Sequence, residues 1–221
     1  MLYFVPTPIG NLKDITLRAL EVLQSVDLIL CENPHHSQKL LQAHQIAKPT
    51  RQCNQFANEQ LFASIASALS SGQSIAYISD AGMPGISDPG SELISFAIQN
   101  KLPFTVLPGA NACLPTLVAS GFLRKEFYFA GFLPLKKGRK TQISKLLVFT
   151  CPVVLYESPY RINKLLAELV AVGAGNRQVM IGRELTKMYE EYIHGSAEEL
   201  AVRYQDKVWK GELVVVIDAI S

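Results

Sequence analysis

Short apolar runs alternate with helical patterns through the first half of the chain. A short apolar run between turn residues is typical of a buried strand, and apolar residues three and four apart are typical of a helix. Strands are expected at residues 2–5, 27–31, 74–78 and 104–107. Helices are expected from Asp14 or Thr16 onward and at 37–44, 59–71 and 91–99. This alternation predicts a mostly parallel sheet whose strands are joined by crossover helices.

The pattern changes beyond about residue 111. Strand-like runs follow at 127–129, 153–156, 178–181 and 213–217, with a further short run at 190–194 and fewer helices between them. This pattern predicts a second α/β domain built on a mixed sheet. We therefore expect two α/β domains, residues 1–112 and residues 113–221, with a linking helix near 112–120.

Charge is distributed unevenly between these two domains. The first holds 6 Lys and Arg against 8 Asp and Glu, and the second holds 15 against 11. The net charge of +2 is too small to imply nucleic-acid binding by itself. The basic excess makes the second domain the expected partner of a polyanion. Its densest basic run, residues 136–140, is expected in an exposed loop.

Several functional classes find no support in the chain. No apolar run is long enough to span a membrane, so the protein is expected in the cytoplasm. The four cysteines form no CxxC pair, which argues against a zinc site or a disulfide framework. His35 and His36 have no evident third ligand, and Ser37 is expected to cap a helix that begins there. No metal site is predicted, and Trp209 is expected to pack against a sheet.

The segment 79–90 follows a predicted buried strand and has an unusual composition. Its sequence, SDAGMPGISDPG, holds three glycines, two prolines and two aspartates. Glycine permits close approach of the backbone, and proline stiffens a loop and removes N–H donors. Rigid loops at the carboxyl ends of strands are where open α/β sheets bind ligands. The segment therefore predicts a shaped binding loop, although a tight turn rich in glycine and proline is the plainer alternative.

Other polar loops occupy the same position after predicted strands. Together they suggest one crevice built from both halves of the chain. They lie at residues 6–11, 79–90, 108–112, 156–161 and 182–187, with 210–212 preceding the last strand.

The order of these segments resembles the tetrapyrrole methylase superfamily, the class III S-adenosylmethionine-dependent methyltransferases. Within it, the chain is most similar to the small-subunit ribosomal RNA methyltransferase I family, which methylates a cytidine ribose 2′-oxygen in 16S rRNA. The matching segments are VPTPIGNLKDITLRAL (5–20), SDAGMPGISDPG (79–90), LPGANA (107–112), FAGFLP (129–134), YESPYRI (156–162), GRELTKMYEE (182–191) and KGE (210–212).

The resemblance implies that S-adenosyl-L-methionine binds in a cleft between the two domains. It also implies a homodimer that acts on 16S rRNA or the small ribosomal subunit. By its charge, the basic run 136–140 is the candidate contact to the RNA backbone, with a solvated loop as the alternative. The cofactor-binding residues carried over from the matching motifs are Ile9, Asp80, Met83, Asn111, Ala112, Tyr156, Leu185 and Glu212.

Methyl transfer from a sulfonium needs alignment above all, because the methyl group is already activated. A ribose hydroxyl is a poor nucleophile, so a base or a cation near it would help. Lys187 and Glu184 are the catalytic candidates, and their i, i+3 spacing would bring them together in a helix; a surface ion pair is the alternative. The substrate-binding candidates are Asn11, Asp14, Asp88, Arg161, Arg183 and Glu190, with an interdomain salt bridge as the alternative for the two arginines.

Two segments depart from the family pattern. Family members carry Asp-Thr-Arg after the acid of the second strand, whereas Glu32 is followed here by NPHHS at 33–37. A histidine-bearing segment of the family is replaced by QCNQFANE at 52–59. These departures keep two alternatives open: a methyltransferase for a small acceptor such as a tetrapyrrole precursor, and a non-catalytic paralogue that binds cofactor or RNA.

Overall fold

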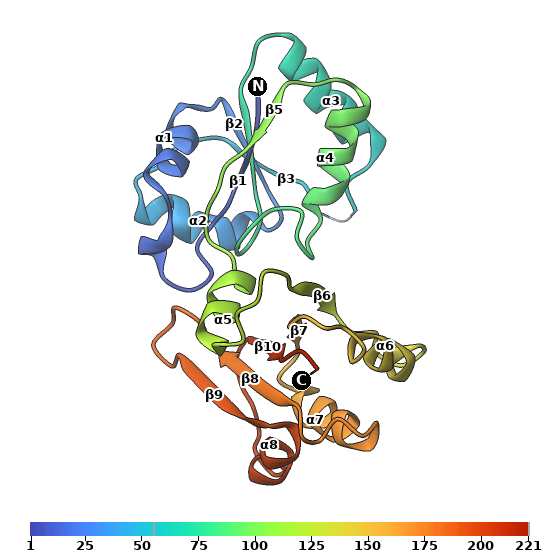
Figure 1. The fold of residues 1–221 in the computed structure, drawn as a ribbon. Helices are drawn as coiled ribbons and strands as arrows, with labels where there is room; N and C mark the ends of the chain where they lie inside the picture. Colours follow the sequence, from blue (N-terminus) through green and yellow to red (C-terminus); the bar gives the residue numbers. More distant parts are fainter. Residues whose placement is uncertain (55, 221) are drawn as a thin grey trace. The chain divides into compact units, whose positions relative to one another are not determined.

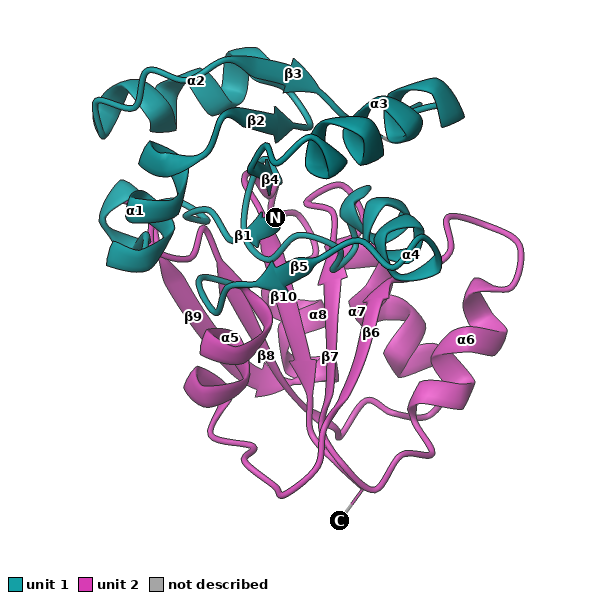
Figure 2. Cartoon of the chain, turned by 90° about the horizontal axis from the view of Figure 1, so that it is seen from above, with its two compact units in different colours: residues 1–111 teal, residues 112–221 magenta. Residues whose placement is uncertain are grey.

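The computed structural model describes residues 1–54 and 56–220 (Figure 1). The chain divides into two compact units, Met1–Asn111 and Ala112–Ser221, coloured separately in Figure 2. Residue 55, which belongs to the divergent segment 52–59, lies outside the described residues.

Unit 1 is built on a sheet of five parallel strands in the order β3-β2-β4-β1-β5. Its elements are β1 (Leu2–Val5), the 3-10 helix η1 (Leu12–Asp14), α1 (Leu17–Ser25), β2 (Leu28–Cys31), α2 (Pro34–Ala43), β3 (Thr50–Gln52), α3 (Glu59–Ser70), β4 (Ile75–Ile78), α4 (Gly90–Gln99) and β5 (Phe104–Val106). The predicted parallel sheet with crossover helices is confirmed.

Helices cover both faces of this sheet. Leu23 of α1 and Leu41 of α2 pack with Ile29 of β2 on one face, whereas Ile65 of α3 and Leu93 of α4 pack against the other. Figure 1 shows the two helix pairs on opposite sides of the strands. Helices cover both faces, so the sheet is accessible at its edges. The polar loops that follow the strands lie at the carboxyl edge. The connections after β1 and β4 run to opposite sides, which makes this pair of strands the switch point of the sheet.

Unit 2 is built on a mixed sheet in the order β6-β7-β10-β8-β9, in which the neighbours β6 and β7 pair in parallel and the other neighbouring strands pair antiparallel. Its elements are α5 (Cys113–Ser120), β6 (Tyr128–Phe132), α6 (Arg139–Leu146), β7 (Val153–Glu157), α7 (Ile162–Ala171), β8 (Gln178–Arg183), β9 (Glu191–Ser196), α8 (Ala197–Arg203) and β10 (Leu213–Ile217). The predicted mixed sheet is confirmed.

The core of unit 2 lies between its sheet and helices α6, α7 and α8, and α5 packs against β8 and β10. Trp209 is buried in this core, as expected, and its indole N–H donates to Asn163 Oδ1 at 2.7 Å. No helix within the described part of the chain is long and apolar enough to cross a membrane.

Some local predictions are wrong. Helix α2 starts at Pro34 and not at Ser37, because Asn33 is its N-cap and accepts from the backbone N–H of His35 at 3.1 Å. Strand β3 was not predicted, and neither were α6, α7 and α8. The basic run 136–140 is not entirely an exposed loop: Arg139 opens α6 and is only 2% exposed.

Candidate functional site

The loops after β1 and β4 are tied together at the carboxyl edge of the unit 1 sheet. Thr7 and Gly82 form an isolated antiparallel bridge, with N–H to O distances of 3.0 and 2.9 Å. The Thr7 hydroxyl donates to Ser79 O, and the Ser79 hydroxyl donates to Gly82 O, each at 3.1 Å. These bonds are buried. At the switch point of the sheet, the loops after β1 and β4 are therefore fixed to each other by hydrogen bonds.

Gly82 brings the predicted cofactor residues of unit 1 together. Its φ of +82° lies in the left-handed region that favours glycine. A Cβ at this position would lie 3.3 Å from Ile9 Cγ2 and 3.9 Å from Asn111 Cα. Glycine thus allows the loops after β1, β4 and β5 to meet closely, and we call the position where a side chain is absent the Gly82 cradle. Met83 follows in the chain and is half-buried.

Asp80 presents an unsatisfied oxygen at this edge. Its Oδ1 is buried and has no hydrogen-bond partner among the described residues. A buried acceptor left unpaired is costly, so such an oxygen is suited to receive a donor from a ligand. This orphaned acceptor, together with the Gly82 cradle, fits the amino or hydroxyl donors of a nucleoside cofactor.

Glu32, at the end of β2, lies beside Asp80 and was not among the predicted site residues. Its carboxylate accepts from the Asp80 backbone N–H. Burial, followed by the nearby charges of Asp80 and Asp88, raises the pKa of Glu32. Its position directly after a buried strand was the available sequence signal. Glu32 thus adds a second carboxylate to the same edge.

Asp88 holds the central loop closed. Its Oδ1 accepts from the backbone N–H groups of Gly85 at 2.5 Å and Gly90 at 3.0 Å. Burial raises the pKa of Asp88 although these two hydrogen bonds act to lower it. The contacts observed for Asp88 are therefore made within its own loop.

Asn11 and Asp14, the other substrate candidates of unit 1, lie at the 3-10 helix η1. The Asn11 side chain accepts from the Lys13 backbone N–H at 3.1 Å and so caps that helix. Asp14 is exposed within the same helix.

Both divergent segments begin at this same edge, after the neighbouring strands β2 and β3. Gln52 Nε2 donates to Glu32 O at 3.1 Å, which links the two strand ends. His35 and His36 are exposed in the first turn of α2. Among residues 1–54 and 56–220, no group of three or more His, Cys, Asp or Glu side chains could hold a metal ion. The family-like loops and the divergent segments thus occupy opposite halves of one sheet edge.

In unit 2, Lys187 lies in the turn between β8 and β9, and its ammonium group contacts two other predicted residues, Glu184 and Glu212. Lys187 Nζ lies 2.9 Å from Glu184 Oε1 and 3.0 Å from Glu212 Oε2. Glu184 Oε1 also accepts from the Glu212 backbone N–H at 3.0 Å. The predicted contact between Glu184 and Lys187 is present, but the segment is a turn and not a helix, because Glu184 and Thr186 adopt φ values of +51° and +64°.

The electrostatics of this group keep both side chains charged. Partial burial acts to raise the pKa of Glu184, but the hydrogen bonds from Lys187 and from the Glu212 backbone N–H hold it below its usual value. Partial burial acts to lower the pKa of Lys187, but its bonds to Glu184 and Glu212 raise it. Lys187 is therefore an ammonium and not a base at neutral pH.

The remaining polar candidates of unit 2 have partners inside that unit. Arg183 Nη1 lies 3.0 Å from Glu191 Oε2, and its Nε donates to Lys210 O at 2.8 Å. Glu190 accepts from the Thr186 backbone N–H at 2.5 Å and so braces the same turn. Arg161 Nε lies 2.8 Å from Glu157 Oε1. The guanidinium groups of Arg161 and Arg183 are thus held in fixed positions.

The apolar candidates of unit 2 lie around the sheet and α5. Tyr156, on β7, makes edge-to-face contacts with Phe129 and Phe132 at ring-centroid distances of 5.1 and 5.5 Å. Leu185 is buried, and one of its methyl groups lies 3.1 Å from where a Gly182 Cβ would be. Ala112 is the N-cap residue of α5.

A doubly wound parallel sheet in the first unit and a mixed sheet in the second define a class of two-unit α/β proteins. The chain belongs to the tetrapyrrole (corrin/porphyrin) methylase family, whose model matches residues 1–201. It is therefore a methyltransferase.

Among its relatives, a Helicobacter pylori protein named ribosomal RNA small subunit methyltransferase I is 39% identical, with 98% of this chain and 82% of that protein covered. A Bacillus subtilis protein of the same name is 38% identical, with 99% of this chain and 75% of that protein covered.

Solved structures show the same fold. A cobalt precorrin-4 methyltransferase from cobalamin biosynthesis superposes with a TM-score of 0.71 at 16% identity, covering 98% of this chain and 94% of that one. Uroporphyrin-III C-methyl transferase from Thermus thermophilus, complexed with S-adenyl homocysteine, gives a TM-score of 0.64 at 16% identity, with coverage of 97% and 96%.

Proposed function

We propose that this protein transfers a methyl group from S-adenosyl-L-methionine to a ribose 2′-hydroxyl, that of a cytidine, in 16S ribosomal RNA. The observation that carries the methyl-donor part is the orphaned Oδ1 of Asp80 beside the Gly82 cradle. The acceptor part is supported by relatives of 38–39% identity that are named small-subunit ribosomal RNA methyltransferases. A homodimeric assembly, suggested by the family resemblance, and a cytoplasmic location both belong to this proposal.

Unit 1 provides the donor contacts in this proposal. When bound, S-adenosylmethionine supplies a methyl group already activated by its sulfonium. Asp80 Oδ1 accepts a hydrogen bond from a polar group of the cofactor, and Ile9 packs against its apolar surface. Met83 and Asn111 complete the contacts from the neighbouring loops. Tyr156, Leu185, Ala112 and Glu212 are carried into the proposal by the family motifs in which they stand.

Lys187 acts on the acceptor as a cation. Its ammonium is fixed by Glu184 and Glu212 and stays protonated, so it cannot remove a proton at neutral pH. A positive charge beside a hydroxyl stabilises the developing alkoxide and eases its deprotonation. Glu184 is a poor base for the same reason, because its pKa is lowered. We therefore give Lys187 the role of electrostatic stabiliser and Glu184 that of positioning residue, and the proton released by the 2′-hydroxyl would pass to solvent water.

The divergent segments at the ends of β2 and β3 are the basis for a second candidate, a methyltransferase acting on another acceptor. They lie at the same edge as the donor loops but carry no family arginine or histidine pattern at 33–37 and 52–59. A small acceptor such as a tetrapyrrole precursor is the leading alternative, and a non-catalytic cofactor- or RNA-binding paralogue is the third.

The experiment combines cofactor binding with transfer of a labelled methyl group. Small subunits that lack the modification, free 16S rRNA and a tetrapyrrole precursor serve as parallel acceptors. Label in the rRNA supports the proposal, and label in the tetrapyrrole alone would replace it with the second candidate. Cofactor binding without transfer to any acceptor would favour the paralogue, and absence of cofactor binding would remove the donor site as well.

A further inference from the structure

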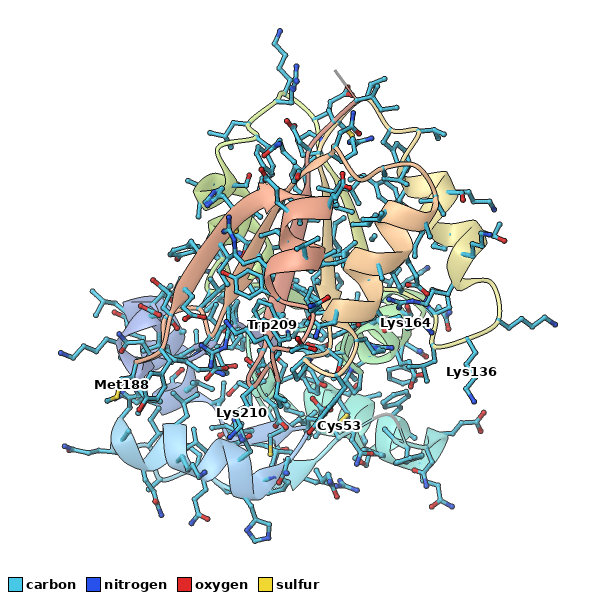
Figure 3. The ribbon with its side chains drawn as sticks, turned by 90° about the horizontal axis from the view of Figure 1, so that it is seen from below. Cys53, Lys136, Lys164, Met188, Trp209 and Lys210 are labelled. Atoms are coloured by element: carbon cyan, nitrogen blue, oxygen red, sulfur yellow. The ribbon has the colours of Figure 1, made fainter. Side chains whose placement is uncertain are left out.

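We propose that three lysines at the entry to α6 form a docking platform for the phosphodiester backbone of the RNA acceptor, an inference that rests on the proposed function. The lysine platform consists of Lys136, Lys137 and Lys140. Figure 3 shows the Lys136 side chain extending outward from the loop that precedes α6.

The stretch from residue 127 to residue 156 carries positive charge only. It contains the three platform lysines, Lys145 and Arg139, with no aspartate or glutamate between Glu126 and Glu157. The platform lysines are exposed, and none forms an ion pair with a residue that the structure describes. No acidic side chain of the described residues therefore pairs with their charge. An uncompensated basic segment of this kind attracts a polyanion.

Arg139, the fifth cation of this stretch, is buried and forms ion pairs within unit 2. Its Nη2 lies 2.8 Å from Glu157 Oε2, and its Nε lies 2.7 Å from Glu168 Oε2. The Arg139 and Glu157 side chains are 2% and 0% exposed. Arg139 is therefore unavailable to a ligand and instead fastens the start of α6 to strand β7 and helix α7.

The platform stands on a packed scaffold. Leu133, just before the loop, and Ile143 and Leu146, on the inner face of α6, are all buried in the core of unit 2. Because the loop is anchored at both ends and Arg139 is fixed between them, the lysine backbones keep constant positions. A docking surface needs this property, since phosphate contacts set the register of a nucleic acid on a protein.

Lysine chemistry indicates what kind of contact the platform makes. An ammonium on a flexible stem is a strongly hydrated point charge that binds phosphate without reading bases. Such contacts give affinity that is independent of sequence and falls steeply with salt. The platform therefore supplies affinity for RNA that flanks the acceptor nucleotide, and it leaves the choice of nucleotide to other residues.

The test compares two triple variants of the full chain. Lys136→Gln/Lys137→Gln/Lys140→Gln removes three platform charges, and Lys39→Gln/Lys101→Gln/Arg203→Gln removes three exposed charges from α2, the turn after α4 and α8. Binding of a 16S rRNA fragment is measured without cofactor over a range of salt concentrations, with methyl transfer assayed separately. Thermal melting verifies that both variants are folded.

We expect the platform variant to bind the RNA on the order of ten-fold more weakly and to lose about 2 units from the slope of log affinity against log salt concentration, three contacts at about 0.7 each. The Michaelis constant for RNA should rise while kcat at saturating RNA stays unchanged. The control variant should keep the wild-type slope.

Equal affinity and slope for the two variants would overturn the platform. If the wild type binds RNA through these lysines but transfers no methyl group, the proposed function fails and the platform stands. If the wild type binds vesicles containing phosphatidylserine through these lysines and does not bind RNA, the platform is a membrane contact and the RNA assignment is wrong.

Discussion

At the scale of single residues, Asp80 and Lys187 show how neighbours decide what a charged group can do. Asp80 has a buried oxygen that no described residue satisfies, so a ligand donor would gain a ready acceptor there. Lys187 contacts two carboxylates with an ammonium that carries three N–H donors, and it keeps its proton. The first arrangement suits binding, and the second suits electrostatic stabilisation.

Removing the Asp80 carboxylate should weaken cofactor binding. For Asp80→Ala we expect the dissociation constant of S-adenosylhomocysteine to rise on the order of ten-fold, or about 1.4 kcal/mol, because one hydrogen bond to a charged acceptor is lost. Asp80→Asn, which retains an acceptor oxygen, should lose less. Titration calorimetry measures both, with Asp206→Ala, at an exposed position of unit 2, as the matched control. Unchanged affinity in Asp80→Ala would remove this residue from the site.

Glu184 should contribute to the acid sensitivity of the fold. Its pKa in the folded chain lies below the ordinary value of 4.5, so its stabilising contribution is present above that pH and is lost as pH falls through the folded pKa. As the pH falls below about 4.5, wild-type stability should therefore decline more steeply than that of Glu184→Gln. Denaturant unfolding across this window checks the prediction. Parallel decline of the two proteins would show that the contact with Lys187 adds nothing to stability.

At the scale of elements, the binding edge of unit 1 depends on loops that touch through their backbones. Thr7 and Gly82 bridge the loops after β1 and β4. Gly109, after β5, packs so closely that a Cβ there would lie 2.7 Å from Pro6 Cβ. Close approach of this kind is open only to glycine. The shape of the edge is therefore set by backbone geometry as much as by side chains.

Two glycine substitutions can distinguish the effect of backbone strain on stability from an effect on cofactor binding at this edge. Gly82 and Gly173 have nearly equal φ values of +82° and +83°, but a Cβ at Gly173 meets nothing within 4 Å. Both Gly82→Ala and Gly173→Ala should lower the free energy of unfolding by about 1–2 kcal/mol. Only Gly82→Ala should also weaken S-adenosylhomocysteine binding, because its methyl group meets Ile9. Equal cofactor affinity in the two variants would show that the cradle is not part of the site.

The buried ion pairs of α6 should be costly to break from one side. Arg139→Met removes one of the two guanidinium partners of the buried Glu157 and leaves Arg161 as the other. It also removes the contact with Glu168, so it should destabilise the protein by about 3–5 kcal/mol. Adding Glu157→Gln should recover part of this loss, because a buried carboxylate that has lost one of its two partners is then removed. Denaturant unfolding of the single and double variants measures both effects. A double variant no more stable than Arg139→Met would mean that packing, and not charge, dominates at this position.

The sequence predicted elements whose signal is local and missed contacts set by distant pairing. Strand β4 (Ile75–Ile78) can be predicted because it is a continuous apolar run. Helix α7 was also readable, since Ile162, Leu165, Leu166 and Leu169 have helical spacing, but it was not predicted. Helix α6 gives a weaker signal, because a buried arginine takes the place of an apolar residue.

The residues of the candidate site also differ in whether a local sequence signal or a distant contact determines their position. Ile9 and Asp80 stand in loops that the sequence placed correctly after β1 and β4. The contact between Lys187 and Glu212 spans 25 residues and follows from the pairing of β8 with β10, which no local pattern encodes. The inward turn of Arg139 likewise follows from the tertiary positions of Glu157 and Glu168.

At the scale of the whole molecule, two cores and an uneven charge distribution suit different tasks. The unit 1 sheet carries the loops that match the family at the donor side, and the first 112 residues hold more acids than bases. The second unit holds the cationic groups, Lys187 and the lysine platform. In our proposal an anionic acceptor is attracted to the second unit, whereas the first contributes Asp80 and its neighbouring loops to the donor site.

The most direct test of this account is the identity of the methylated nucleoside. Small subunits lacking the modification are incubated with the protein and S-adenosylmethionine carrying a labelled methyl group, and the rRNA is digested to nucleosides and analysed by mass spectrometry. The account predicts one labelled product, a cytidine methylated on its ribose 2′-oxygen, with much less of it for Lys187→Met. Label on a base, or no label in rRNA while cofactor binding is intact, would contradict it.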